Sequence, residues 1–567
     1  MKRSGRLGPL VIAVAMALLA ASCGGEDEDG GAAPGGQSQG EQGRPVTGGT
    51  LIDYQNFASG DPDHIDPALA HTIQGSQPGQ LLFDGLTDYD YKTGELKPAV
   101  AESWSSNADA TVWTFRLRNG VTFSNGDPVL PSDFKFAWER AARKEMASEV
   151  AYHITDNARI RGTKAIADGT ATTADGLKAD DAARTLTVEL EAPLSFLPDV
   201  VAHLIFSPVP AKVVQGLPDQ TKWEQDVMIG NGPYKMVEPM RPGQYVKLTR
   251  NDTYWGGINN HKAYIDNIEF RISKDLDSAW AAFEAGQGQT GYIPPARYAE
   301  AKAKYPGRVA EHAVNGLYYW GFNMRDPIVG GPENVKLRQA ISVIIDKQRM
   351  INDIYNGSRK VATGVTPPGI PGYKQGLSQF PTRDVNRARQ LLGEWERATG
   401  KRATDLPPIK LNFGAGAGHA ENATIIQANL RELGINSELD GRESRTYFSQ
   451  MRQGQGQFFR SGWIADYNSY DNMLFPLFGS SNIGTGDNHT QFSNQRFDQL
   501  IDQARRQSDL NRRNEAYQQA EGIVLNEETA VVPLNWYAGT IAWSDRVRNV
   551  IQSALLFVAY EEAWLTT

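Results

Sequence analysis

Disulfide bonds cannot hold this fold together, because the chain of 567 residues contains one cysteine, Cys23. A chain of this length is also too long to pack around one hydrophobic core, so we expect two or three lobes. Hydrophobic residues make up 40% of the chain and aromatic residues 10%. This is enough apolar material for several cores, and it excludes disorder of the whole chain.

The N-terminus carries the pattern of a secretory signal. Basic residues precede an apolar run, residues 7–21, that is too short to span a bilayer as a stable helix. Leu19-Ala-Ala-Ser22 leads directly into Cys23, which resembles a bacterial lipobox, where the cysteine is lipid-modified. We therefore expect residues 1–22 to be a signal peptide and Cys23 to anchor the protein to the outer face of the bacterial cytoplasmic membrane. An ordinary cleavage site with an incidental cysteine is the alternative.

Residues 23–47 hold almost no apolar side chains and are predicted to form a flexible linker after the lipid anchor. The spelling G-x-S-x-G of serine hydrolases occurs there at residues 36–40, but neither flank can form the strand and helix that this motif needs. Removing residues 1–22 changes the formal charge from −9 to −12. An acidic surface argues against a nucleic-acid partner and is compatible with cationic or zwitterionic ligands.

Hydrophobic patterning predicts an α/β protein. Residues 185–192 alternate as a half-exposed strand, and Asn119-Gly120 after residues 112–118 predicts a hairpin. Residues 334–355 have apolar side chains at helical spacing and predict one helix. Between residues 409 and 439 the order is strand, helix, strand, which is typical of parallel strands covered by helices.

One late segment, Arg460-Ser-Gly-Trp463-Ile-Ala-Asp466-Tyr467, joins a guanidinium, an indole, a carboxylate and a phenol. A carboxylate in aromatic surroundings suits a ligand cation, because a partly desolvated charge attracts an opposite charge more strongly than an exposed one does. A buried tryptophan followed by a helix-capping aspartate would leave the same residues in the sequence. The chemistry alone therefore leaves both interpretations open.

This segment resembles the ligand-binding stretch R-x-G-W-x-A-D-Y of solute-binding family 5, the oligopeptide-binding receptors of ABC importers. The resemblance implies that Asp466 receives the α-ammonium of a peptide and that Arg460 can meet a peptide carboxylate. It makes Trp463 and Tyr467 candidate ligand contacts as well. Further matches to the family cover nearly all of residues 48–567, among them Ala101-Glu-Ser-Trp104, Trp113-Thr-Phe-Arg-Leu-Arg118, Gly126-Asp-Pro128, Gly230-Asn-Gly-Pro-Tyr234, Tyr254-Trp-Gly-Gly257 and Arg338-Gln-Ala340.

The family also places an aromatic strand beside its ligand cleft, so Tyr318 and Tyr319 are further candidate contacts. Aromatic residues that only fill the core of a strand would give the same pattern.

The resemblance implies a two-lobed α/β fold of the periplasmic-binding-protein (Venus-flytrap) type with an additional small β-rich subdomain. The expected parts are lobe I (48–86, 205–308 and 536–567), the subdomain (87–204) and lobe II (309–535). Two such lobes close around a ligand, and a membrane permease recognises the closed form. The implied partners are a peptide and the transmembrane subunits of an ABC permease, and we expect a monomer.

The sequence offers no catalytic constellation. Its eight histidines show no H-E-x-x-H or other metal-ligand spacing, so we expect no metal, no cofactor and no enzymatic activity. Carboxylates are plentiful, however, and a glycosidase pair stays open. The alternatives are a family 5 receptor for a non-peptide solute (an oligosaccharide, a chelated metal or an opine-like compound), an extracellular hydrolase, and a surface receptor that signals.

Overall fold

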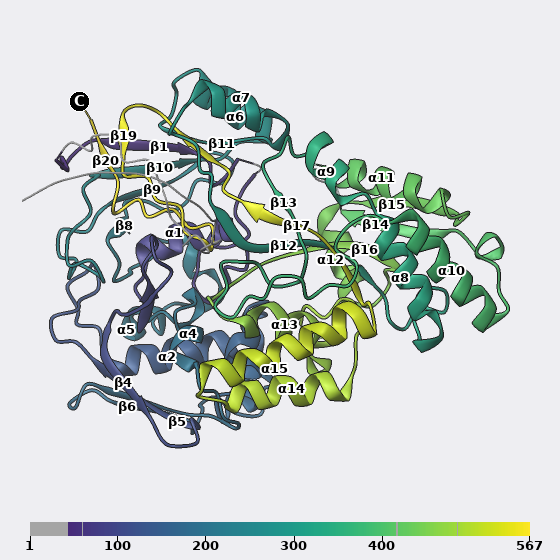
Figure 1. Cartoon of the computed structure of the whole chain (residues 1–567). Coiled ribbons are helices and arrows are strands. Elements are labelled where there is room, and N and C mark those ends of the chain that lie inside the picture. The colour runs from purple at the N-terminus through teal and green to yellow at the C-terminus, as the bar shows by residue number, and fades with distance from the viewer. Residues whose placement is uncertain (1–43, 59, 415–417, 485, 567) are drawn as a thin grey trace, which may run out of the picture.

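The computed structural model describes residues 44–58, 60–414, 418–484 and 486–566, and two six-stranded sheets form its frame (Figure 1). The first sheet has the strand order β18-β11-β1-β10-β9-β8, with β1 parallel to both of its neighbours. Its strands are β1 (Thr50–Tyr54), β8 (Tyr234–Met236), β9 (Tyr245–Arg250), β10 (Asn267–Arg271), β11 (Thr290–Tyr292) and β18 (Ile541–Trp543).

The second sheet has the strand order β13-β17-β12-β16-β14-β15. Its strands are β12 (Ala313–Phe322), β13 (Lys360–Val361), β14 (Ile409–Gly414), β15 (Ser437–Arg442), β16 (Phe458–Ile464) and β17 (Val531–Ala538). Strands β14 and β15 are parallel and are joined by helix α11 (His419–Arg431), which confirms the predicted strand, helix, strand order. Strand β16 lies inside the sheet, between β12 and β14.

A smaller sheet of order β4-β5-β7-β6 packs against helix α2 (Pro131–Ala142). Its strands are β4 (Ala101–Ser106), β5 (Val112–Leu117), β6 (Leu177–Asp180) and β7 (Thr185–Glu189), and two strand pairs lie apart from it: β2 (Thr87–Tyr89) with β3 (Leu96–Pro98), and β19 (Val547–Arg548) with β20 (Trp564–Leu565). The hairpin predicted at Asn119-Gly120 is wrong. A turn does form there, but β5 already pairs with β4 on one edge and β7 on the other.

The remaining helices surround these sheets. They are α1 (Ile73–Leu82), α3 (Thr163–Ala167), α4 (Leu197–Val200), α5 (Ala211–Val214), α6 (Leu276–Glu284), α7 (Tyr298–Lys304), α8 (Val335–Ile344), α9 (Lys347–Asp353), α10 (Val385–Thr399), α12 (Ser444–Arg452), α13 (Tyr470–Phe478), α14 (Gln495–Arg506) and α15 (Leu510–Gly522). None of the helices in the described part of the chain combines the length and the apolar character that crossing a membrane requires.

The single helix predicted over residues 334–355 is two helices, α8 and α9. Ile345 has an extended backbone and ends α8. The side chain of Asp346 then accepts a hydrogen bond of 3.0 Å from the Arg349 N–H and caps the start of α9. Capping of this kind outweighs a continuous apolar stripe, because it satisfies a donor that the helix start leaves open.

Two main hydrophobic cores form around these sheets and helices. The larger one unites the first sheet, the four-stranded sheet and helices α13 to α15. The second surrounds the second sheet with α8, α10 and α11. Figure 1 shows α13 to α15 beside the helices that cover the four-stranded sheet. The residue boundaries of the lobes stay a prediction.

The chain crosses between the two large sheets as a paired ribbon. Residues 309–313 and 538–542 run antiparallel, bridged at one end in the first sheet and at the other in the second. Between these ends, the Gly539 N–H donates to the carbonyl of His312 at 3.1 Å. A Cβ on Gly539 would lie 2.6 Å from the Cβ of Ala310, so a side chain cannot fit where the strands touch.

Candidate functional site

Asp466 lies in the short connection between β16 and α13, and its side chain is 22% exposed. Asn472, in the first turn of α13, donates from Nδ2 to Asp466 Oδ2 at 3.0 Å. The Oδ1 atom of the same amide accepts from the Asp466 backbone N–H and from Trp463 Nε1, both at 2.9 Å. One side chain therefore fixes the carboxylate and the indole relative to each other.

The Asp466 carboxylate is partly desolvated and lies beside a histidine. Burial raises the pKa of Asp466 to about 7, against the opposing effect of the Asn472 hydrogen bond. Among the residues that the structure describes, no lysine or arginine forms an ion pair with it, and the basic group at ion-pair distance is His153, with Nε2 at 3.6 Å from Oδ2. Burial lowers the pKa of His153 well below its usual value, so this imidazole is neutral at neutral pH. A partly desolvated, unpaired carboxylate of this kind attracts a ligand cation.

Two histidines meet at Asp466. His153 begins the π-helical turn η2 (His153–Asn157), and His203 precedes the 3₁₀ turn η3 (Leu204–Phe206). Ligand atoms of His153, His203 and Asp466 all lie within 4.8 Å of one another. The two imidazole rings stack with their centroids 4.3 Å apart, and burial lowers the pKa of His203 to about 3. Both rings are thus neutral at neutral pH, and the lone pair of His203 Nδ1 accepts a hydrogen bond from the Ile205 N–H.

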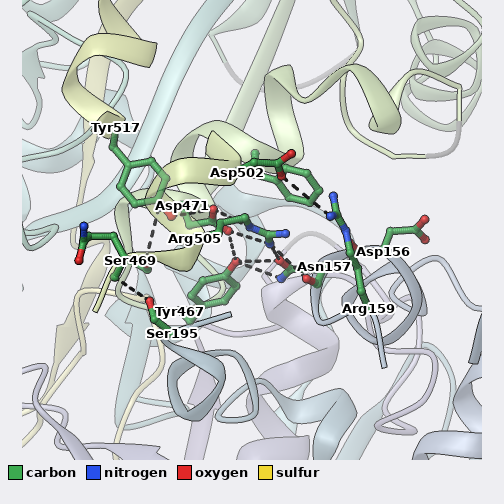
Figure 2. A network of polar contacts seen from close by, with 12 residues as sticks. Asp156, Asn157, Arg159, Ser195, Tyr467, Ser469, Asp471, Asp502, Arg505 and Tyr517 are labelled. Carbon is green, nitrogen blue, oxygen red and sulfur yellow. Dashed lines mark hydrogen bonds and ion pairs between the residues drawn. The ribbon is translucent and has the colours of Figure 1, made fainter. Parts of the chain in front are cut away.

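Residues that neighbour His153 and Asp466 in the chain take part in a buried polar network, shown in Figure 2. Arg505 donates to both carboxylate oxygens of Asp471, at 3.0 Å from Nε and 3.1 Å from Nη2, and to the Asn157 carbonyl at 3.2 Å. The hydroxyl of Tyr517 donates to Asp471 at 2.9 Å, and that of Tyr467 does so at 3.2 Å. Asn157 Nδ2 in turn donates to the Tyr467 hydroxyl at 3.0 Å. The network ties α14 and α13 to the turn that carries His153.

Arg460 and Trp463 are three residues apart on β16 and therefore point to opposite faces of the second sheet. The Arg460 guanidinium lies over the ring of Tyr318 at 4.9 Å. A second guanidinium, that of Arg359, lies 4.7 Å from the ring of Tyr537 and 6.0 Å from that of Tyr318. Within the described ranges, neither arginine forms an ion pair with an acidic side chain. Two unpaired guanidiniums on an aromatic surface suit an anionic group.

The six predicted ligand contacts divide into two groups. Partly exposed are Arg460, Trp463 and Asp466, whereas Tyr318, Tyr319 and Tyr467 are at most 1% exposed. The hydroxyl of Tyr467 is bound inside the network just described, and that of Tyr318 lies 3.1 Å from His419 Nδ1. In this structure the tyrosines support the site from within, and their contact with a ligand stays a prediction.

Sequence reasoning missed four residues of this region: His153, His203, Arg359 and Asn472. Asn472 follows the matched segment closely, and its amide chemistry is a local signal that could have been used. The two histidines and Arg359 come from distant segments that only the tertiary structure brings here, so the spacing of histidines along the chain could not reveal the cluster.

A separate cavity of about 100 Å³ is lined by side chains that include Asp84, Asp88 and Glu561. Burial raises the pKa of both aspartates to about 7 and that of Glu561 to about 8. Charge repulsion from Asp84 also raises the pKa of Asp88, and repulsion from both aspartates raises that of Glu561. The acids that line this cavity therefore keep their protons to a higher pH than exposed carboxyls do.

Comparison with known proteins agrees with this architecture. Residues 95–485 match the family described as "Bacterial extracellular solute-binding proteins, family 5 Middle". The chain is 28% identical over 517 residues to the oligopeptide-binding protein OppA of Bacillus subtilis, covering 89% of this chain and 91% of that protein. It is 26% identical over 570 residues to the dipeptide-binding protein DppE of the same organism, covering 98% of each.

The solved structure of the Escherichia coli murein tripeptide-binding protein MppA matches with a TM-score of 0.77 and 25% identity, over 92% of this chain and 99% of that one. The predicted two-lobed fold of the periplasmic-binding-protein type is thereby confirmed.

Proposed function

The chain belongs to family 5 of the bacterial extracellular solute-binding proteins, and on that premise we propose that it is the peptide-binding receptor of an ABC importer. It captures a peptide between its lobes and delivers it to a membrane permease. The observation that carries this proposal is the carboxylate of Asp466, which is partly desolvated, reachable from solvent and without a lysine or arginine partner among the described residues. The α-ammonium of a peptide supplies the missing cation.

The opposite end of the peptide is assigned to Arg460. Its guanidinium lies on the Tyr318 ring, close to that of Arg359, and both lack an acidic partner in the described part of the chain. A peptide carboxylate placed there gains charge-assisted hydrogen bonds. Trp463, held by Asn472 beside Asp466, contributes an apolar wall near the ammonium. Main-chain hydrogen bonds along an extended peptide complete the recognition.

The protein acts outside the cytoplasm, in agreement with the description of its family. We propose that a lipid on Cys23 anchors it to the membrane and that residues 23–47 are the tether; both lie wholly or mostly outside the described residues. The relatives named above are binding proteins, and we assign this chain the same role, as a monomer that binds its ligand without converting it.

Calorimetry with purified protein tests the proposal. A mixed set of tripeptides to pentapeptides is compared with the same set N-acetylated, for the wild type and for Asp466→Asn. Free peptides should bind the wild type, whereas acetylated peptides and the variant should give little heat. Asp502→Asn is the matched control, because it removes an equal charge from a half-exposed position and should leave binding unchanged.

The outcomes separate the parts of the proposal. Equal binding of free and acetylated peptides would remove the ammonium role of Asp466 and leave a peptide receptor. If neither set binds, the peptide proposal fails, and a family 5 receptor for another solute takes its place. Product formation during incubation, followed by mass spectrometry, would instead support the hydrolase alternative.

A further inference from the structure

Three side chains with metal-ligating atoms lie close together at the Asp466 carboxylate. They are His153, His203 and Asp466, which come from η2, from the residue before η3 and from the connection after β16. Their ligand atoms lie within 4.8 Å of one another, and His153 Nε2 is already 3.6 Å from Asp466 Oδ2. Metal bonds of about 2.0–2.2 Å place ligand atoms roughly 3–4 Å apart, so loading requires a contraction of about 1 Å.

We propose that His153, His203 and Asp466 bind one divalent ion of the first transition series, such as Ni²⁺ or Zn²⁺. Two imidazole nitrogens and one carboxylate oxygen form a donor set that suits these ions, whereas Mg²⁺ and Ca²⁺ prefer oxygen ligands throughout. Three protein ligands leave at least one coordination position for water or for a group of a bound molecule.

The immediate surroundings are suited to this ion. No lysine or arginine forms an ion pair with Asp466 in the described ranges, so the carboxylate is open to an ion. His153 faces Asp466 through Nε2, and its Nδ1 is buried without the outer hydrogen-bond partner that usually orients a ligating histidine. Asn472 orients the carboxylate as an outer partner of the site. Loading has one cost: His203 Nδ1 accepts a 3.3 Å hydrogen bond from the Ile205 N–H, which fixes the tautomer of the free ring.

This site does not depend on peptide transport, but it shares Asp466 with the proposed ammonium site. An ion and a peptide α-ammonium cannot both pair fully with one carboxylate, so each should weaken the other. The chain would then respond to the local concentration of transition-metal ions as well as to peptides.

Isothermal titration with NiCl₂, ZnCl₂ and MgCl₂ tests the proposal on untagged protein carrying Cys23→Ser, which removes the only thiol. The wild-type site should bind one equivalent of Ni²⁺ or Zn²⁺ and show no comparable heat with Mg²⁺. His153→Ala and His203→Ala should each weaken binding by more than about tenfold, because even outer partners of metal sites are worth about 10–100-fold. His64→Ala removes a histidine that is 43% exposed and should change nothing.

Electron paramagnetic resonance of the Cu²⁺-loaded protein gives a second readout, which should show two coordinated imidazoles in the wild type and one in either variant. His203→Gln replaces His203→Ala if the latter does not fold. Metal binding no tighter than that of Mg²⁺, or equal affinity in wild type and both variants, would overturn the site. Peptide titrations in EDTA keep the two proposals apart, because peptide binding there would survive the failure of the metal site.

Discussion

The buried pair of Arg505 and Asp471 should be one of the most costly places to remove a single charge. Their side chains are 4% and 0% exposed, and two hydrogen bonds join them. Arg505→Met keeps most of the volume over Phe475, where the guanidinium lies 4.0 Å from the ring, but leaves the carboxylate uncompensated. Breaking a buried pair in this way costs about 3–5 kcal/mol. The two tyrosine hydroxyls that still donate to Asp471 place the expectation at the lower end, ~3 kcal/mol.

A double-mutant cycle isolates this effect. Arg505→Met, Asp471→Asn and the double variant are unfolded in urea and followed by tryptophan fluorescence and by circular dichroism, since coincident transitions are needed for a two-state free energy. In the Asp471→Asn background, Arg505→Met should cost at least ~1.5 kcal/mol less than it does in the wild type, because no buried charge is stranded. The same cost in both backgrounds would show that the pair is not coupled and would refute the reasoning.

Three further expectations concern binding, pH and local stability. Asp466→Ala should weaken peptide binding by ~3 kcal/mol, about a hundredfold in affinity, because the buried ammonium of the peptide then has no ion-pair partner. Calorimetry measures this, and an unchanged affinity would contradict the assignment. The raised pKa of Glu561 makes the wild type lose stability as pH rises from about 4.5 through about 8. Glu561→Gln should therefore leave the free energy of unfolding near pH 4 unchanged and raise it by about 5 kcal/mol at pH 9, measured by urea unfolding. Parallel pH profiles for the two proteins would refute this. Asp346→Ala should destabilise the start of α9 by ~1 kcal/mol, seen as faster hydrogen exchange over residues 347–353, whereas exchange in α10 serves as the internal control.

Local sequence patterns predicted the parts of the fold that depend on residues close together in the chain. The strand, helix, strand order around α11 rests on periodicity alone and is confirmed. Two predictions are wrong, for different reasons. One polar side chain, Asp346, interrupts an apolar stripe and splits the predicted helix. The hairpin at Asn119-Gly120 fails because β5 finds its partners elsewhere, and no local turn signal reports how many edges of a strand are already paired.

Some residues of the candidate site could likewise be predicted from the sequence, and others could not. Asp466 could be singled out because its chemistry and its family pattern lie within one short segment. The burial of Tyr467 could not, since its hydroxyl is bound by Asn157, more than three hundred residues earlier in the chain. His153 and His203 are also far from Asp466 in the chain, and their approach to it depends on how the segments around the four-stranded sheet pack against α13 and α14.

The ribbon of residues 309–313 and 538–542 has a mechanical consequence. Because its two strands are hydrogen-bonded and touch at Gly539, they must bend together, and sliding one along the other would break the bond to His312. Such a ribbon is compliant to rotation and stiff to shear. We therefore expect the two large sheets to move relative to each other mainly by rotation about this ribbon, so ligands of different size should lead to variants of one closed shape.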